Sequence, residues 1–288
     1  MDNDVLVYVN GEMFPMMEAK ISVFDRSFGY GDGVFEGIRA YDGLIFKLKE
    51  HVDRLYRSAA AIRIEIPLTK SDFCNDIKRV VRENAFKDAH IRPHVSRGNG
   101  FNSGLNPLNT TKPNIVIIAR SISGSLEGFK LATASVRKIP PMCIDPRIKS
   151  ACYLVQILAR FNALDAGADE AIMLDTQGYI SEGCGDNIFV VKNGILYTPP
   201  AWQALEGITR ETVIEMSKRE GIIVHETQLT TYNVYTADEV FIVGSAWGIV
   251  SVVKVDNIVI SGGMTGKLTQ RIMKLYKEEV KKGEPVYI

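Results

Sequence analysis

The chain has 288 residues, 46% hydrophobic and 24% charged, so it can bury the core of one large domain or two medium ones. Lysine plus arginine (34) balance aspartate plus glutamate (34), which argues against a nucleic-acid or an anionic membrane partner. The four cysteines form no CxxC pair, the four histidines have no metal-ligand spacing, and no apolar run approaches a membrane span. We therefore expect a cytoplasmic protein without disulfides or a metal site.

The first third of the chain alternates apolar and polar residues between turn signals. The pairs Asn10-Gly11 and Asp42-Gly43 favour two-residue type I′ turns, so an antiparallel meander is expected. Apolar residues at helical spacing then predict helices from Lys49 to about Ile62 and from Ser71 to about Ala85.

Two strands are predicted next, over residues 90–97 and 114–120. The Gly/Asn/Pro-rich segment Gly98–Pro113 between them is too long for a simple hairpin. Because unusually long loops in compact domains are often functional, we interpret it as a candidate substrate lid. Arg92 and Arg97 are five residues apart on the first strand, so they should point to opposite faces, one toward a pocket and the other toward solvent.

A segment of small residues at 121–127 suits an interdomain loop, which predicts a smaller N-terminal domain at 1–120 and a larger C-terminal domain at 128–288. Ser150 is expected to cap a helix that Gly167 ends. The predicted apolar face of this helix comprises Leu154, Ile157, Leu158, Phe161 and Leu164. Later strands and helices include a hairpin at Asn193-Gly194, a helix from Thr209 to Gly221 and a last amphipathic helix at about 265–280. The expected fold class is mixed α/β.

Lys149 and Glu182 are the most informative single residues. A lysine in an enclosed site can act as an amine nucleophile and form a Schiff base with an aldehyde. A buried carboxylate can pair with a heterocyclic nitrogen, and pyridoxal 5'-phosphate (PLP) needs both groups. Taken singly, however, most lysines are solvated surface groups and most Ser-Glu-Gly triplets are ordinary turns.

Two segments could bind a phosphate through backbone N–H groups. Glycine precedes the helix that starts at Ile208 and Thr209, and helix N-termini attract anions, although a plain threonine cap would look the same. The small residues at Gly244–Ala246 end a predicted strand and could cradle an anion. Arg54 could be a solvated residue or could reach a phosphate with its guanidinium.

The glycine-rich run at residues 28–39 is not a dinucleotide-binding fingerprint, because strand-like residues and not a helix follow it. Its aromatic residues Tyr30 and Phe35 could instead line a pocket, although core packing would also explain them.

Seven blocks, in order over nearly the whole chain, carry a family resemblance: FGYGDGVFEGIRAY, HVDRLYRSA, HIRP, KSACYL, GYISEGCGDNIF, LEGITRE and TADEVF. Together they resemble the branched-chain amino-acid aminotransferases of PLP fold type IV. The resemblance implies a two-domain α/β fold with PLP at the domain interface, a role in branched-chain amino-acid metabolism, amino-acid and 2-oxo-acid substrates, and a homodimer or higher homo-oligomer.

The resemblance also implies roles for individual residues. Lys149 matches the Schiff-base lysine, Glu182 the partner of the pyridine nitrogen, and Tyr153 the partner of the phenolic oxygen. The residues that match the phosphate cup are Arg54, Ile208, Thr209 and Ser245. The residues that match the substrate site are Tyr30, Phe35, Gly37, Arg92 and Ala246, and Trp247 adjoins them.

This chain departs from the family pattern at three places. It reads Gly-Ser-Ala-Trp-Gly at 244–248 where Gly-Thr-Ala-Ala-Glu is usual, it has His90 where an aromatic residue is usual, and the loop after Arg97 is longer. We expect Trp247 to narrow or reshape the small-substituent side of the pocket.

The sequence predicts transfer of an amino group between a branched-chain L-amino acid and 2-oxoglutarate by a ping-pong mechanism, with Arg92 and Tyr30 recognising the acceptor's distal carboxylate. Within the same fold type, a D-amino-acid or (R)-amine transaminase and an aminodeoxychorismate lyase remain alternatives. The lyase ranks lower because it usually lacks a tyrosine at the position of Tyr153. A catalytically silent binding protein is the alternative from a different class, and the joint presence of Lys149, Glu182 and Arg54 argues against it.

Overall fold

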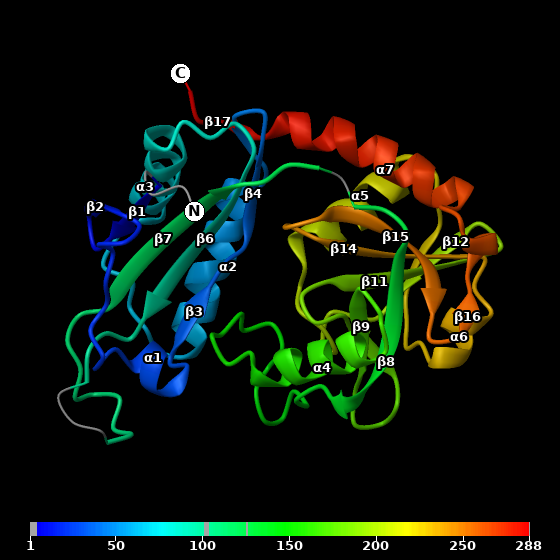
Figure 1. Ribbon diagram of the computed structural model, residues 1–288, viewed down its shortest axis with the longest axis horizontal. Coiled ribbons are helices and arrows are strands. Elements are labelled where there is room, and N and C mark those ends of the chain that lie inside the picture. The colour runs from blue at the N-terminus through cyan, green and yellow to red at the C-terminus, as the bar shows by residue number, and fades with distance from the viewer. Residues whose placement is uncertain (1–4, 101–103, 125, 288) are drawn as a thin grey trace. The chain divides into compact units, whose positions relative to one another are not determined.

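The computed structural model describes residues 5–100, 104–124 and 126–287 (Figure 1). The chain divides into two compact units. The first contains Met1–Ser123, Ile148–Cys152 and Val280–Ile288, and the second contains Gly124–Arg147 and Tyr153–Glu279. None of the helices in the described part of the chain is long and apolar enough to span a membrane.

The first unit is built on an antiparallel sheet whose strand order is β17-β5-β4-β6-β7-β1-β2, with β3 also paired to β6. Its strands are β1 (Leu6–Val9), β2 (Glu12–Pro15), β3 (Gly33–Phe35), β4 (Ile38–Tyr41), β5 (Leu44–Ile45), β6 (Ala89–Ser96), β7 (Asn114–Ser121) and β17 (Glu284–Pro285). Its helices are α1 (Arg26–Tyr30), α2 (Leu48–Ala61), α3 (Lys70–Glu83) and the short η2 (Val280–Lys282).

The predicted hairpins form because their turn residues tolerate positive φ angles. Asn10 and Gly11 join β1 to β2 with φ values of 52° and 104°, and Asp42 and Gly43 join β4 to β5 with values of 46° and 77°. Two residues with φ above zero are what a type I′ turn requires. The predictions of both turns, and of the two helices that follow, are confirmed.

Helices α2 and α3 pack against one face of the first sheet and form its apolar core, in which Leu55 and Phe73 are fully buried. Strand β6 alternates accordingly: Ile91 and Val95 point into this core. Because successive side chains of a strand point to opposite faces, His90, Arg92 and His94 share the other face. This open face carries the polar and charged residues discussed below.

The second unit contains a mixed sheet with the order β10-β9-β8-β15-β14-β11-β12-β13, and β16 also pairs with β15. Its strands are β8 (Phe129–Arg137), β9 (Glu170–Leu174), β10 (Ile180–Glu182), β11 (Asn187–Lys192), β12 (Ile195–Thr198), β13 (Val224–Glu226), β14 (Glu239–Gly244), β15 (Gly248–Val255) and β16 (Ile258–Val259). Its helices are α4 (Leu154–Asp165), α5 (Ile208–Arg219), α6 (Thr231–Tyr235), α7 (Lys267–Glu279) and the short η1 (Ser261–Gly263).

Helix α4 packs differently from the sequence expectation. It buries only Ala159 and Ala163, which are four residues apart and lie against alanines of β8 and β9. The predicted apolar face points away from this core, and its large side chains remain between 44% and 67% exposed. Small side chains allow the helix to approach the sheet closely, so the bulky stripe is left on the outside.

The predicted cap of α4 is wrong. Tyr153 and not Ser150 occupies the cap position, and no side chain of the described residues caps this end of the helix. Ser150 lies too early in the chain to cap this helix. It forms a β-bridge with Val34 of the first unit instead.

The segment around Lys149 also departs from the expected division. Sequence order assigned Lys149 to the C-terminal domain, but Ile148–Cys152 packs with the first unit. The N–H of Phe35 donates to the carbonyl of Lys149 at 3.0 Å, and the N–H of Ala151 donates to the carbonyl of Gly33 at 2.8 Å. These backbone bonds attach the lysine to β3.

Candidate active site

Lys149 is half-buried on the first unit, next to the ring of Phe35. Its ammonium nitrogen lies 4.7 Å from the ring centroid, and its backbone N–H donates to the hydroxyl of Ser58 at 3.2 Å. The contact with the aromatic face is a cation–π interaction. Because β3 binds the backbone at Lys149 and Ala151 and Ser58 of α2 binds the Lys149 N–H, the direction of the lysine side chain is set by the fold.

The Phe35 ring connects Lys149 to the open face of β6. The guanidinium of Arg92 also lies 4.7 Å from the ring centroid, and the ring of His94 stacks on Phe35 at 5.3 Å. A Cβ atom on Gly37 would lie 3.2 Å from the Nε2 atom of His90, so a larger residue at 37 would crowd that histidine. Of the residues predicted from the sequence, Lys149, Phe35 and Arg92 are therefore brought together.

The histidines of this face are uncharged near neutral pH. Burial, followed by the positive charge of Arg92, lowers the pKa of both His90 and His94 to about 4. The open face of β6 therefore carries its positive charge on Arg92 and presents neutral imidazoles on either side of it.

Arg54 is not a solvated residue. It is almost fully buried, and its Nε and Nη2 atoms donate to the two oxygens of Glu36 at 2.7 and 2.8 Å. The Nδ1 atom of His51 lies 2.8 Å from the same carboxylate. Burial alone would raise the pKa of Glu36, but Arg54 and His51 outweigh it and keep the pKa well below its usual range. Glu36 therefore orients the arginine that was predicted to bind phosphate.

In the second unit, Glu182 is a buried carboxylate with two partners. Its Oε2 atom accepts a hydrogen bond from the N–H of Leu205 at 2.9 Å, and its Oε1 atom accepts from the ammonium of Lys138. Burial alone would lower the pKa of Lys138, but the attraction of Glu182 raises it, so the lysine is charged. A carboxylate has about four acceptor positions, so Glu182 can accept a further donor.

Helix α5 begins at Ile208, as the phosphate-site prediction requires. Gly207 occupies its cap position, so this end of the helix has no side-chain cap. A Cβ atom on Gly207 would lie 1.9 Å from the Oδ1 atom of Asn187, so a larger residue here would displace the Asn187 side chain. The N-terminus of α5, with Thr209 buried in its first turn, therefore presents backbone donors suited to an anion.

Ser245, Ala246 and Trp247 form the turn between β14 and β15. The N–H of Trp247 donates to the carbonyl of Gly244 at 3.2 Å, which closes the turn. The indole is 44% exposed and meets the ring of Phe129 edge-on, with centroids 6.5 Å apart. Tyr153 is half-buried at the start of α4.

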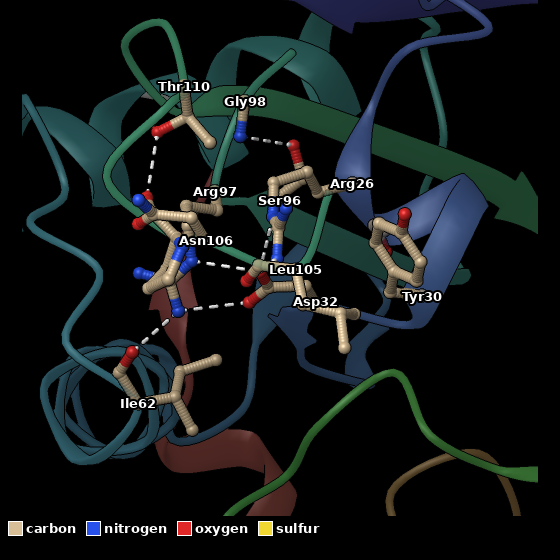
Figure 2. Close-up of polar contacts among 12 residues, drawn as sticks. Arg26, Tyr30, Asp32, Ile62, Ser96, Arg97, Gly98, Leu105, Asn106 and Thr110 are labelled. Carbon is tan, nitrogen blue, oxygen red and sulfur yellow. Dashed lines mark hydrogen bonds and ion pairs between the residues drawn. The ribbon is translucent and has the colours of Figure 1, made fainter. Parts of the chain in front are cut away.

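Tyr30 ends helix α1, and its ring lies 5.0 Å from the guanidinium carbon of Arg26 (Figure 2). One of the two arginines of the strand predicted at 90–97 was expected to face solvent, and Arg92 is exposed whereas Arg97 is not. The Arg97 side chain is 13% exposed and forks onto both oxygens of Asp32. The predicted lid follows Arg97 directly, and residues 101–103 of it lie outside the described residues.

The groups in the two units fit PLP by their chemistry. The first unit offers a lysine amine beside an aromatic ring, and the second offers a buried carboxylate and a helix N-terminus without a side-chain cap. These groups suit, in turn, an aldehyde, a pyridine nitrogen and a phosphate.

Sequence reasoning missed two residues that hold these groups in place, Glu36 beside Arg54 and Lys138 beside Glu182. An acidic residue inside the apolar run GVFEGI was a usable signal for Glu36, and no comparable signal marks Lys138.

Comparison with known proteins gives the family. Residues 33–255 match the family described as Amino-transferase class IV. This chain belongs to that family. A provisionally named branched-chain-amino-acid aminotransferase of Methanocaldococcus jannaschii is 47% identical over 285 residues, which cover 98% of this chain and 99% of that protein.

Solved structures agree with this assignment. The T.th. branched-chain amino acid aminotransferase complexed with N-(5'-phosphopyridoxyl)-L-glutamate matches with a TM-score of 0.91 and 38% identity, covering 96% of this chain and 93% of that one. The same enzyme complexed with 4-methylvaleric acid also matches with a TM-score of 0.91 and 38% identity, covering 98% and 96%. The family and fold type predicted from the seven motifs are confirmed.

The depressed pKa of His94 predicts a dependence of stability on pH. In the unfolded chain the imidazole titrates at its ordinary value of 6.5, and in the folded chain at about 4. The unfolded state therefore binds more protons between these values, so stability falls as the pH drops from 6.5 toward 4. Between pH 7 and pH 5 the free energy of unfolding of the wild type should fall by roughly 1–2 kcal/mol more than that of His94→Phe, which keeps the ring stack.

Urea unfolding at the two pH values measures this difference. His225→Phe is the matched control, because His225 is exposed and lies beside the ring of Tyr197. An equal loss of stability in wild type and His94→Phe would contradict the prediction.

Proposed function

We propose that this chain is a PLP-dependent aminotransferase that transfers the amino group of a branched-chain L-amino acid to 2-oxoglutarate by a ping-pong mechanism. The main support is the shared position of Lys149 and Arg92, each 4.7 Å from the Phe35 ring. An amine nucleophile and a cation able to bind a carboxylate thus adjoin one apolar surface. Such a surface suits a site that accepts an apolar donor and a dicarboxylate acceptor in turn.

The cofactor, when bound, supplies an aldehyde and a ring that accepts electron density. Lys149 would hold the cofactor through its amine, and the same amine would serve as the base for the proton on the substrate's Cα atom. Glu182 keeps the ring nitrogen protonated, and the contacts of Lys138 and the Leu205 N–H fix that carboxylate in place. Tyr153 would donate a hydrogen bond to the phenolic oxygen of the cofactor.

The phosphate is held by charge and by backbone donors. Arg54 supplies the charge, and the Glu36 carboxylate fixes the direction of its guanidinium. Ile208 and Thr209 at the start of α5, together with Ser245 in the β14–β15 turn, supply N–H and hydroxyl donors.

The substrate residues divide by chemistry. Phe35 and Gly37 form the apolar wall for a branched side chain, while Arg92 and Tyr30 bind the distal carboxylate of the acceptor. Ala246 offers its backbone to the substrate α-carboxylate, and Trp247 adds bulk beside it. The complexes of the T.th. enzyme with a glutamate adduct and with 4-methylvaleric acid are consistent with both kinds of substrate.

The competing functions use the same cofactor residues. A D-amino-acid or (R)-amine transaminase and an aminodeoxychorismate lyase would both require Lys149 and Glu182, and no feature of the described residues favours them. A silent binding protein would have no need of a fixed lysine on Phe35, of a carboxylate held by two donors and of a buried Arg54 together.

We further propose that the enzyme is a cytoplasmic homo-oligomer. All four cysteines are unpaired, as expected in a reducing compartment. The five large apolar side chains on the outer face of α4 are only partly covered, which is unusual for a monomer. A second copy of the chain would cover this stripe.

Charging the α4 stripe should weaken self-association. We expect the double variant Ile157→Glu, Phe161→Glu to lower the molar mass measured by light scattering at micromolar concentration, because it would bury carboxylates in an apolar interface. Tyr232→Glu, which charges a more exposed aromatic residue on α6, is the control and should leave the mass unchanged. An unchanged mass in the double variant would remove α4 from the interface.

The assignment of Lys149 is tested by substitution and labelling. Because only a primary amine at this position can hold the aldehyde, Lys149→Ala should reduce transamination by about 10³-fold or more. Borohydride treatment of wild type loaded with PLP, followed by peptide mapping, should place the label on Lys149. Lys130→Ala, which removes an exposed lysine of β8, should retain both activity and label. A label on any other lysine would refute the proposal.

A further inference from the structure

Arg26 is a buried arginine to which neither the motifs nor the proposed mechanism assigns a role. Its side chain is 6% exposed, and its Nε atom donates to the Oδ2 atom of Asp32 at 2.8 Å. Its Nη1 and Nη2 atoms donate to the backbone carbonyls of Gly104 and Leu105 at 3.0 and 3.2 Å. One guanidinium therefore connects a carboxylate near Tyr30 with two carbonyls of the predicted lid.

The carboxylate of Asp32 is shared with a second arginine (Figure 2). Arg97 donates to its two oxygens at 2.8 and 2.9 Å, and also to the carbonyls of Ile62 and Arg63 at 2.7 and 2.9 Å. Burial alone would raise the pKa of Asp32, but the two arginines outweigh it and lower the pKa. Asp32 thus remains charged and ties the end of α2 to the same cluster.

Arg26 also touches Tyr30 directly. The guanidinium carbon lies 5.0 Å from the centre of the tyrosine ring. Figure 2 draws both side chains. The backbone of the same segment pairs with the start of the lid, since the N–H of Arg26 donates to Gly98 at 3.0 Å and the N–H of Gly100 donates to Phe24 at 2.9 Å. Arg26 is therefore the side chain through which Tyr30 and residues 104–105 are positioned together.

A buried arginine–carboxylate–arginine cluster is a poor device for stability. The desolvation of three charges consumes most of the attraction between them, and apolar replacements of such clusters are often neutral or stabilising. A planar fork does, however, fix geometry, because three donors of Arg26 meet three acceptors in set directions. The cluster is thus suited to positioning the groups around it.

On the basis of the proposed function, we propose that Arg26 is a positioning residue for the acceptor. It holds Tyr30 and the Gly104–Leu105 backbone in one arrangement, so that Tyr30 can act with Arg92 on the distal carboxylate of a dicarboxylic 2-oxo acid. Arg26 itself does not contact the reacting atoms. Its loss should weaken acceptor binding and leave cofactor binding intact.

The test compares Arg26→Met and Arg26→Lys with the matched control Arg79→Met. Arg79 also joins a carboxylate and a backbone carbonyl, those of Glu83 and Gly11, but lies on the exposed side of α3. For Arg26→Met we expect the KM for 2-oxoglutarate to rise about tenfold, with less than about a threefold change in kcat and in the affinity for PLP. The control should match the wild type.

Hydrogen exchange supplies an independent readout that needs no activity. The peptide covering residues 104–113 should exchange at least about fivefold faster in Arg26→Met than in the control. Arg26→Lys keeps a charge beside Asp32 but cannot serve both carbonyls, so its KM and exchange rate should lie between wild type and Arg26→Met. If Arg26→Met does not fold, the same two shifts in Arg26→Lys decide the question.

The outcomes separate this inference from the proposed function. Wild type without transaminase activity would refute the proposed function, and with it the role in acceptor binding, while the exchange data would still report on the lid contacts. An active wild type, with Arg26 variants of unchanged KM and exchange, would refute the positioning role alone. A fall in kcat and in PLP affinity that accompanies the rise in KM would also overturn it, because that pattern indicates a general structural role.

Discussion

The attachment of Lys149 to β3 is the constraint on which the site depends. The backbone bonds from Phe35 to Lys149 and from Ala151 to Gly33 hold a segment that lies more than a hundred residues away in the chain. They place the lysine amine over the ring of Phe35, and Phe35 in turn lies beneath Arg92. The strand that carries Phe35 therefore also sets the position of Lys149, the proposed nucleophile.

The buried charges around the site occur in compensated groups. Glu36 is paired with Arg54, Asp32 with Arg26 and Arg97, and Glu182 with Lys138. Each acid is held by hydrogen bonds from fixed donors, since an unpaired buried charge would be costly. The common result is orientation: each pair fixes the direction of a group that the proposed chemistry requires.

Local signals were enough to predict much of the fold. The three turns at Asn10-Gly11, Asp42-Gly43 and Asn193-Gly194 and the long amphipathic helices depend on neighbouring residues, so their prediction succeeded. The family resemblance and the aminotransferase assignment were confirmed because seven ordered motifs carry more information than any single residue.

Features that depend on tertiary contacts were not predictable. The outward stripe of α4 follows from its contact with alanines of two distant strands, and the failed cap at Ser150 follows from a bridge to Val34. The contact between Arg97 and Asp32 was not predicted, because the period of a strand says nothing of a partner from another element. Lys138 was missed for the same reason, since only the fold brings it to Glu182.

We propose that the groups of this site transfer the amino group of an L-amino acid. The most direct test mixes wild type loaded with PLP with L-leucine or D-leucine in the absence of an acceptor, and measures the 2-oxo acid released in a single turnover. We expect about one equivalent of 4-methyl-2-oxopentanoate per bound cofactor from L-leucine, and none from D-leucine. Release from D-leucine alone, or from neither enantiomer, would contradict it.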